Sequence, residues 1–197
     1  MHTQWQYHQP VLPADNEAFT QYGQVIQQID SSELVAKLKA EFAIPQDGVE
    51  YVRTTEILES LMAVKQLAHQ VYGDMAIQAG YVCGHNRGLA GVEYHQGSEV
   101  IVAATDLILL LGKREDMRGG RFDSRRAVAF SVQRGQIVEL YGTTLHHCPC
   151  HVDREEGFLA AIILLQGTNA ALSNLEPDGI LARQNTWFTH CDRIELT

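Results

Sequence analysis

The chain has 197 residues, of which 45% are hydrophobic and 20% charged, and these proportions are ordinary for a soluble globular protein. A formal net charge of −9 argues against nucleic acid or an anionic membrane surface as the main partner. The sequence shows neither an apolar run of membrane-spanning length nor the basic and apolar stretches of a secretory signal. We therefore expect a cytoplasmic protein whose main partner is a small-molecule substrate and which can form a homodimer.

Two helices are expected in the N-terminal part of the chain. The run Asp30-Ser31-Ser32-Glu33 has the pattern of a capped helix start, and the helix that follows should end near Pro45. The run Thr54-Thr55-Glu56 opens a second helix that should end at Gly73, and its apolar stripe consists of Ile57, Leu61, Val64, Leu67, Ala68 and Val71. A link with glycines at 80, 84 and 88 leads into the middle of the chain.

From residue 91 onward the sequence favours short β-strands. Apolar runs rich in Val, Ile, Leu and Phe recur between turn signals at 100–103, 107–111, 127–132, 137–141 and 158–165. Short strands without intervening helices are typical of an antiparallel sandwich or barrel. The charged stretch 113–126 should be a solvated hairpin loop, with a lid that binds phosphate or carboxylate as the alternative. We expect residues 1–80 to form a helical extension packed on a barrel of residues 81–197, as one structural unit.

Four candidate metal ligands lie between residues 93 and 146. Glu93, His95 and Glu99 are separated by two and four residues, so a regular strand would point all three side chains to one face. A later strand, after Gly135, can bring His146 alongside as the fourth donor. Two imidazoles and two carboxylates suit a divalent transition metal: Mn, Fe, Ni, Co or Zn. In the alternative interpretation the glutamates are exposed strand residues and His95 bonds a backbone carbonyl.

The cysteines offer a second, weaker candidate for a metal site. In a reducing compartment Cys83, Cys148, Cys150 and Cys191 should be free thiols. The run Cys148-Pro149-Cys150, flanked by histidines, has no second pair of ligands elsewhere in the sequence. We therefore expect no structural zinc site there.

The spacing of the four candidate ligands resembles that of the cupin superfamily of double-stranded β-helix barrels. Glu93-x-His95-x3-Glu99 is similar to the first cupin motif, with Glu in place of its first His, and the spacing from Gly135 to His146 is similar to the second motif. The resemblance implies a mainly β fold, a cupin-type double-stranded β-helix (jelly-roll) barrel with N-terminal α-helices, and a metal held by the four donors. Several motif positions differ from the superfamily, namely Arg87 and Asp106 in place of glycines, and Tyr141, Thr143 and Cys150 in place of Pro, Gly and Asn.

Two narrower resemblances bear on function. Segments such as G-V-E-Y-H-Q-G-S-E and L-H-H-C-P-C look like an uncharacterised family of bacterial cupin-like proteins, over nearly the whole chain. The order of His95 and then His146-His147 is locally similar to ureidoglycolate lyase, and the glutamates allow a comparison with cupin sugar isomerases, hence with carbohydrate metabolism. The uncharacterised family supplies no established reaction. An octahedral metal held by four protein groups would leave two positions for a chelating substrate, and this chemistry favours a metal-dependent isomerase or lyase acting on a small polyhydroxy, keto or hydroxy-acid compound.

Three residues near the second motif are candidate catalytic groups. Glu139 can act as a general base and Tyr141 as a hydrogen-bond donor if their strand face lines the barrel, and His147 should lie at the rim of the pocket. A solvent-facing Glu139 fits the sequence equally well. Tyr94 alternates with the proposed ligands and should face away from the metal. The sequence leaves open whether the protein is an enzyme, and the alternatives are a non-catalytic metabolite- or sugar-binding module and a cupin oxygenase.

Overall fold

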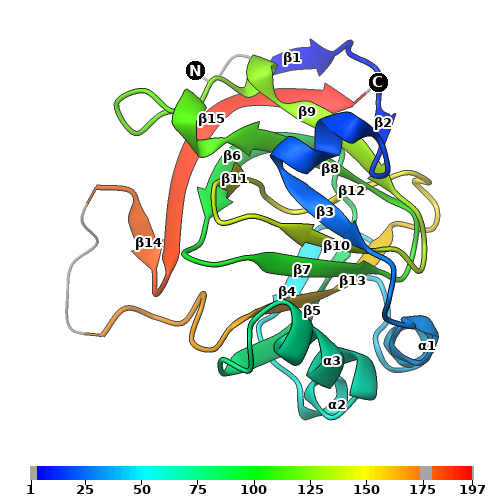
Figure 1. Cartoon of the computed structure of the whole chain (residues 1–197). Helices are drawn as coiled ribbons and strands as arrows, with labels where there is room; N and C mark the ends of the chain where they lie inside the picture. Colours follow the sequence, from blue (N-terminus) through cyan, green and yellow to red (C-terminus); the bar gives the residue numbers. More distant parts are fainter. Residues whose placement is uncertain (1–3, 174–178, 197) are drawn as a thin grey trace.

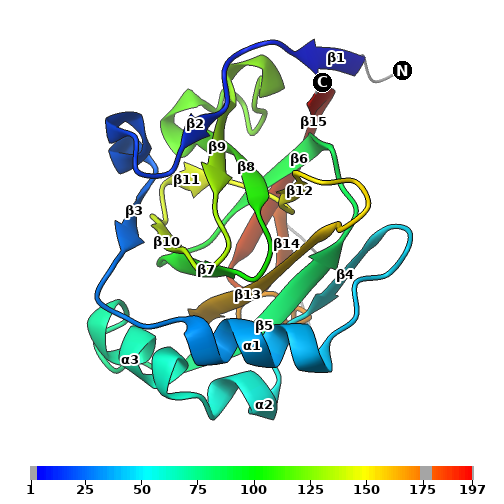
Figure 2. The same ribbon diagram turned by 90° about the vertical axis from the view of Figure 1, so that its right-hand side faces the viewer.

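The computed structural model describes residues 4–173 and 179–196. Residue 1, where the predicted helical extension begins, and residue 197, where the predicted barrel ends, lie outside the described residues. Two β-sheets face each other, and three helices lie together against the outer side of one of them (Figures 1 and 2). Among the described residues, no helix has the length and apolar character needed to cross a membrane.

The first sheet has six strands, and the helices cover its outer face. Its central strands follow the order β5-β13-β7-β10, each antiparallel to its neighbours, with β3 and β4 at the two edges. The bounds are β3 Gly23–Ile26, β4 Val49–Val52, β5 Ile77–Gly84, β7 Glu99–Ala103, β10 Ile137–Leu140 and β13 Phe158–Leu165.

The second sheet faces the first across the barrel interior. Strand β8 pairs with β9, β11 and β12, and a β-bridge between Glu93 and His146 joins β6 to this sheet. On the other side of β6 lies β15, which also pairs with β1 and β14. The bounds are β1 Gln4–Tyr7, β2 Leu12–Pro13, β6 Gly88–Tyr94, β8 Leu107–Lys113, β9 Val128–Val132, β11 Thr144–Leu145, β12 Cys150–His151, β14 Leu181–Arg183 and β15 Thr186–Leu196.

This strand order is that of a jelly roll. From β5 to β13 the chain passes from one sheet to the other at nearly every connection, so that β5, β7, β10 and β13 form one sheet while β6, β8, β9, β11 and β12 belong to the other. The expectation of a mainly β jelly-roll barrel with N-terminal helices is confirmed. The predicted strand at 158–165 is β13 without any shift of its ends, and those at 100–103, 107–111, 127–132 and 137–141 correspond to β7, β8, β9 and β10.

Apolar side chains fill both the barrel interior and the layer below the helices. In β7, Ile101 and Ala103 point into the interior, whereas Val100 and Val102 pack against the helical layer. The six-stranded sheet is therefore covered on both faces. The bounds of the helices are α1 Ser32–Glu41, α2 Glu56–Glu59 and α3 Met62–Gln70, and the 3-10 turns are η1 Glu17–Gln21, η2 Arg114–Asp116 and η3 Ser124–Arg126.

The second predicted helix is in fact two helices. Thr55 caps the first of them, because its side chain accepts a hydrogen bond from the backbone N–H of Ile57 at 3.2 Å. At Leu61 the backbone becomes extended, with φ −69° and ψ 145°, so the chain leaves the helix and starts α3 one residue later. The break lets Leu58 and Leu61 both enter the core below the sheet.

The N-terminal part supplies strands as well as helices. Strands β1, β2, β3 and β4 pair with β15, β9, β10 and β5, and the proposed boundary at residue 80 falls inside β5. β5 itself lies where the sequence suggested a link. Its Gly80 allows a close approach of β4, since a Cβ atom at Gly80 would lie 1.9 Å from the carbonyl oxygen of Val52.

Candidate metal centre

The first three predicted donors lie at the corner where the chain passes from one sheet to the other. Glu93 is near the end of β6, His95 follows it, and Glu99 opens β7 in the opposite sheet. The chain turns at Gly97, where φ is +100°, a conformation that favours glycine. The spacing predicts one regular strand for these three residues. The structure instead places Glu93 in β6 and Glu99 in β7. The turn nevertheless directs their side chains toward one region.

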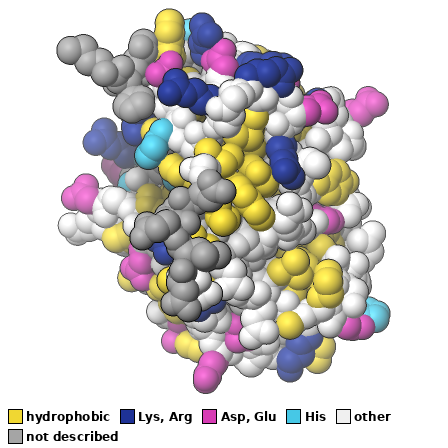
Figure 3. Space-filling model, turned by 90° about the vertical axis from the view of Figure 1, so that its left-hand side faces the viewer, with side chains coloured by type: hydrophobic (Ala, Val, Ile, Leu, Met, Phe, Trp, Pro, Cys, Tyr) yellow, Lys and Arg dark blue, Asp and Glu magenta, His cyan; other side chains and the backbone are white. Residues whose placement is uncertain are grey.

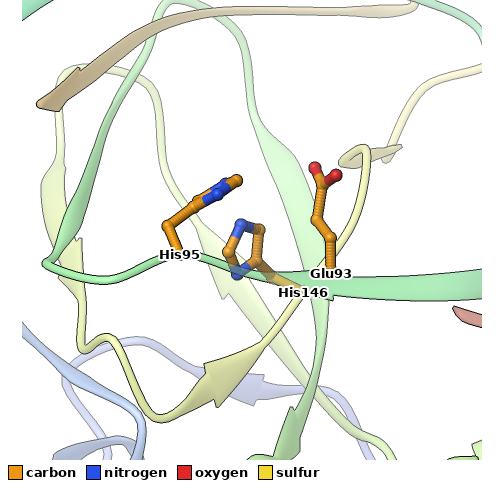
Figure 4. Close-up of side chains that lie close together, drawn as sticks. All are labelled: Glu93, His95 and His146. Atoms are coloured by element: carbon orange, nitrogen blue, oxygen red, sulfur yellow. The ribbon is translucent and has the colours of Figure 1, made fainter. Parts of the chain in front are cut away.

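His146 reaches the same region from the end of β11. Its backbone N–H donates to the carbonyl of Glu93 at 3.0 Å, and the N–H of Glu93 donates to the carbonyl of His146 at 2.7 Å. Ligand atoms of Glu93, His95 and His146 lie within 4.8 Å of one another, and Figure 4 shows the three side chains on the same side of the ribbon. Glu99 Oε2 lies 3.4 Å from His95 Nε2 and 3.3 Å from His146 Nε2. The structure thus brings all four predicted donors together.

The Nδ1 atom of each imidazole, in His95 and in His146, donates to a backbone carbonyl. Nδ1 of His95 lies 2.9 Å from the carbonyl oxygen of Asn185, and Nδ1 of His146 lies 3.1 Å from that of Thr144. A carbonyl oxygen can only accept, so each Nδ1 carries a hydrogen and each Nε2 faces inward. Histidines that bind metals are commonly held by such a bond on the second nitrogen.

The Nε2 atoms of the two imidazoles have no hydrogen-bond partner among the described residues. His95 and His146 are only 2% and 4% exposed, and the Nε2 atoms of both lack a hydrogen bond among the described residues. They face the carboxylate of Glu99 at ion-pair distance. Two lone pairs and a carboxylate in a buried place repel one another unless a proton or a metal cation lies between them.

The pKa shifts of Glu99 and His146 show that the cluster favours a positive charge between its donors. Burial alone would raise the pKa of Glu99, but the two imidazoles beside it hold that pKa well below its usual range. Burial lowers the pKa of His146, but the attraction of the Glu99 carboxylate for the protonated imidazole is stronger than this effect. The pKa of His146 is therefore raised to about 9. In the absence of metal the cluster therefore retains a proton near neutral pH. A divalent cation can replace that proton, and the donor set fits such an ion.

The cluster lies in the wall of a cavity of about 600 Å³ that Glu93, Glu99 and His146 line. The same wall carries two arginines, Arg53 and Arg183. Strands β14 and β15 contribute to its lining, and Figure 3 shows hydrophobic side chains gathered near the centre of the face that carries these strands. The cavity therefore combines apolar walls with the donor cluster at one side and positive charge elsewhere, which is typical of a small-molecule site.

The three predicted catalytic residues are placed differently. His147 lines the cavity, with its ring centroid 5.6 Å from that of Phe188. Glu139 lies on the side of β10 that faces away from the barrel interior, where its carboxylate accepts hydrogen bonds from Gln24 Nε2 at 2.6 Å and Ser98 Oγ at 2.5 Å. Neither Glu139 nor Tyr141 is among the described residues that line the cavity.

Tyr94 points away from the donor cluster, as its alternation with the ligands predicts. Its ring stacks on Trp187 with a centroid distance of 5.3 Å, and the guanidinium of Arg114 lies 4.3 Å from the ring centroid. Tyr94 belongs to the apolar layer on the outer side of the second sheet. It therefore stabilises the strand that carries Glu93 without reaching the cavity.

Sequence reasoning missed several residues of the site. Asn185 supports both sides of the corner, since its carbonyl accepts from His95 and its side-chain Oδ1 accepts from the backbone N–H of Gln96 at 2.9 Å. Its φ of +56° is a conformation that asparagine tolerates, so the Gln-Asn-Thr run carried a turn signal. Arg53 directly follows β4 and Arg183 is the last residue of β14, and local patterning did not predict these strands.

The cysteines do not form a second metal site in the described structure. All four are free, and Cys148 Sγ donates to the carbonyl of its neighbour Pro149 at 3.4 Å. Burial raises the pKa of the Cys150 thiol to about 12 and that of the Cys83 thiol to about 11. Thiols with raised pKa values stay protonated and are poor metal ligands.

Comparisons with known proteins give a family but no activity. A family model described as "Domain of unknown function (DUF4867)" matches residues 11–196, and no curated protein matches the chain. Oxalate decarboxylase from Bacillus subtilis at pH 4.6 is a similar solved structure, with 12% identity, a TM-score of 0.36, and coverage of 65% of this chain and 28% of that chain. A structure of the same enzyme described by its Mn(II) centres gives the same values. At that TM-score the likeness carries no argument, so the fold assignment rests on the strand pairing.

Proposed function

The chain belongs to the DUF4867 family, and we propose that it is a metal-dependent cupin-like enzyme, of isomerase or lyase type, for a small polyhydroxy, keto or hydroxy-acid compound. One observation carries the proposal. Two buried imidazoles are held by backbone carbonyls so that their unpartnered Nε2 atoms meet the Glu99 carboxylate in the wall of a cavity. A structural histidine pair would have its inner nitrogens hydrogen-bonded instead.

Glu93, His95, Glu99 and His146 are the residues that would hold the metal. Mn, Fe, Ni, Co or Zn suits two imidazole nitrogens and two carboxylates. When bound, such an ion polarises a carbonyl or hydroxyl group of the substrate and stabilises the negative charge that develops on it. Glu93, which is only half-buried, is the donor that a substrate in the cavity approaches most directly.

The cavity favours a substrate with a negative group. Arg53 and Arg183 line it, and Arg53 is steadied by a hydrogen bond from its Nη1 to Gln78 Oε1 at 3.2 Å. A guanidinium pairs with both oxygens of a carboxylate, which makes a hydroxy acid or keto acid a better fit than a neutral sugar. We therefore infer that the arginines bind the substrate's acid group while its hydroxyl or keto group faces the donor cluster.

His147 is the acid–base residue that the cavity presents. Burial lowers the pKa of His147, so its imidazole is neutral and can take up a proton, which an isomerisation or an elimination requires. Tyr51 lines the same cavity, and burial raises the pKa of its hydroxyl to about 12, although the hydrogen bond from Asn169 acts in the other direction. The Tyr51 hydroxyl therefore stays protonated and can donate a hydrogen bond to a substrate oxygen.

The test combines metal analysis with a substrate screen. The purified protein should contain one divalent metal per chain, and His95→Ala should abolish it, whereas His69→Ala should not, because His69 is exposed and its described partner is Asp74. Full metal retention by His95→Ala would refute the ligand assignment.

The screen then covers hydroxy acids, keto acids, ureido acids, sugars and sugar phosphates. Metal-dependent conversion of an acidic compound is the expected outcome, and His147→Ala should slow that conversion while keeping the metal. Saturable binding of such a compound without any conversion would contradict the enzymatic part of the proposal and support a metabolite-binding module.

A further inference from the structure

A second cavity, of about 430 Å³, lies beside the first and is lined by a different set of residues. The segment that follows β11 contributes to both cavities, since His147, Cys148 and Pro149 line the first and His151 lines the second. The connection from β5 to β6, the end of β15, the residues before β4 and Arg154 also line the second cavity. None of the residues proposed for metal binding or catalysis takes part in it.

Positive charge dominates this wall. Three arginines line it, Arg87, Arg154 and Arg193, against two carboxylates, Asp47 and Glu195. Glu195 already accepts a hydrogen bond from Arg193 Nε at 2.8 Å, so these two charges offset each other. Two guanidinium groups then remain against one exposed carboxylate, which favours an anion in the cavity.

The exposed side chain of Arg87 makes a hydrogen bond at the edge of the cavity. Its Nη2 donates to the carbonyl oxygen of Leu196 at 3.0 Å, which leaves its other N–H groups for a further partner. Arg154 is exposed and lines the same cavity. A planar guanidinium is well suited to binding oxyanions.

Two histidines form the floor of the cavity. The rings of His85 and His151 lie edge to face, with centroids 5.6 Å apart. Nδ1 of His85 lies 3.0 Å from the carbonyl oxygen of Pro45, so this nitrogen is the donor and its Nε2 remains for another partner. Both rings belong to residues that line the cavity.

An unpaired nitrogen atom of His151 is a separate observation that indicates a ligand. Its side chain is only 8% exposed, and its Nδ1 has no hydrogen-bond partner among the described residues. Leaving such an atom unpaired costs free energy, so a buried unpaired nitrogen in a cavity wall indicates a missing partner. Burial and the nearby charges of His85, Arg87 and Arg154 lower the pKa of His151, and a bound anion would relieve the repulsion among these groups.

We infer that the second cavity binds a phosphate group, carried either by inorganic phosphate or by a small phosphate ester. Arg87 and Arg154 contact its oxygens, and His85 and His151 donate further hydrogen bonds. A carboxylate has two oxygens to offer two guanidinium groups and two imidazoles, whereas a phosphate has three or four, so phosphate matches the number of donors better. A metal fits less well, because two of the four residues proposed to contact the ligand are arginines, and the grouping of three potential metal ligands found among the described residues is Glu93, His95 and His146.

The test is calorimetric titration with inorganic phosphate, and separately with glycerol phosphate, at constant ionic strength set by chloride. The wild-type protein should bind one equivalent saturably. Arg154→Gln should raise Kd at least about tenfold, which corresponds to the loss of one charge-assisted hydrogen bond. Arg121→Gln is the matched control, because Arg121 is an exposed arginine outside both cavities, and its Kd should stay within about twofold of wild type.

The two ligands separate the two sources of the phosphate group. Tighter binding of glycerol phosphate supports an ester, and equal or tighter binding of inorganic phosphate supports the free ion. Imidazole NMR signals of His85 and His151 should shift on binding, while that of His69 should not. The inference is overturned if neither ligand binds saturably up to about 10 mM, or if Arg154→Gln and Arg121→Gln bind phosphate equally well.

Discussion

Replacing Glu99 by glutamine is the sharpest test of the metal centre. The carboxylate lies 3.3 Å and 3.4 Å from the inner nitrogens of His146 and His95, and its side chain is 8% exposed. Glutamine keeps the shape of the side chain but removes the negative charge on which a transition metal depends. Changing a residue that only supports a ligand already costs 10- to 100-fold in affinity, so loss of a ligand should cost at least about 100-fold, or about 3 kcal/mol.

The assay is a competition titration of chelator-stripped protein with Mn²⁺ and Zn²⁺, together with metal analysis of the protein as purified. Glu139→Gln is a matched control. Glu139 is buried to the same degree, 8% exposed, and its carboxylate accepts two hydrogen bonds on the outer side of the neighbouring strand. The control variant should bind metal with the stoichiometry and affinity of the wild type, since its carboxylate is outside the donor cluster.

Two results would refute the reasoning. If Glu99→Gln keeps wild-type metal affinity to within about threefold, Glu99 is not a ligand. If Glu99→Gln and Glu139→Gln lose metal equally, the loss reflects damage to the buried strands rather than removal of a donor. Urea unfolding of both metal-free variants distinguishes these cases, because a folded Glu99→Gln protein without metal affinity is the result that the geometry predicts.

Three further predictions concern the corner that carries the donors. In the metal-free protein, the pKa of His146 raised from 6.5 to about 9 contributes stability that is complete below pH 6.5 and is lost as the pH rises toward 9, so urea midpoints should fall over that range in wild type but not in His146→Gln. Gly97→Ala should destabilise the protein by about 1–3 kcal/mol, because φ is +100° and a Cβ atom would lie 2.8 Å from Leu165 Cδ1; an unchanged urea midpoint would contradict this. Tyr94→Ala should cost about 3–5 kcal/mol through loss of the buried contact with Trp187, while metal analysis of the folded fraction should still give one ion per chain.

The sequence predicts best the features that short-range chemistry determines. The start of α1 follows an Asp-Ser-Ser signal, in which Asp30 Oδ1 accepts from the backbone N–H of Ser32 at 2.9 Å. β13 was predicted without error because both of its faces are buried, which makes Phe158–Leu165 a continuous apolar run. The convergence of Glu93, His95 and Glu99 also depends on local structure, since a single corner around Gly97 joins the three.

Long-range pairing accounts for most of what the sequence did not predict. β15 contains Thr, His, Asp and Arg among its residues, and it is a strand because β6, β1 and β14 pair with it. The short strands β3 and β4 likewise depend on β10 and β5 at the edges of the first sheet. The side on which Glu139 lies could not be predicted either. Helices cover the outer face of its sheet, so apolar residues occur on both faces and alternation does not identify the interior.

The position of the donors relative to the two sheets explains why a buried, charged cluster is tolerated in this barrel. Glu93, His95 and His146 come from the sheet of β6 and β11, whereas Glu99 comes from the facing sheet. Each imidazole is oriented by a backbone carbonyl of its surroundings, so the geometry of the cluster does not depend on the ion. A proton can balance Glu99 when metal is absent, which keeps the fold intact. A divalent cation bound as proposed would meet a site already formed and would add a link between the two sheets at the corner where β6 leads into β7.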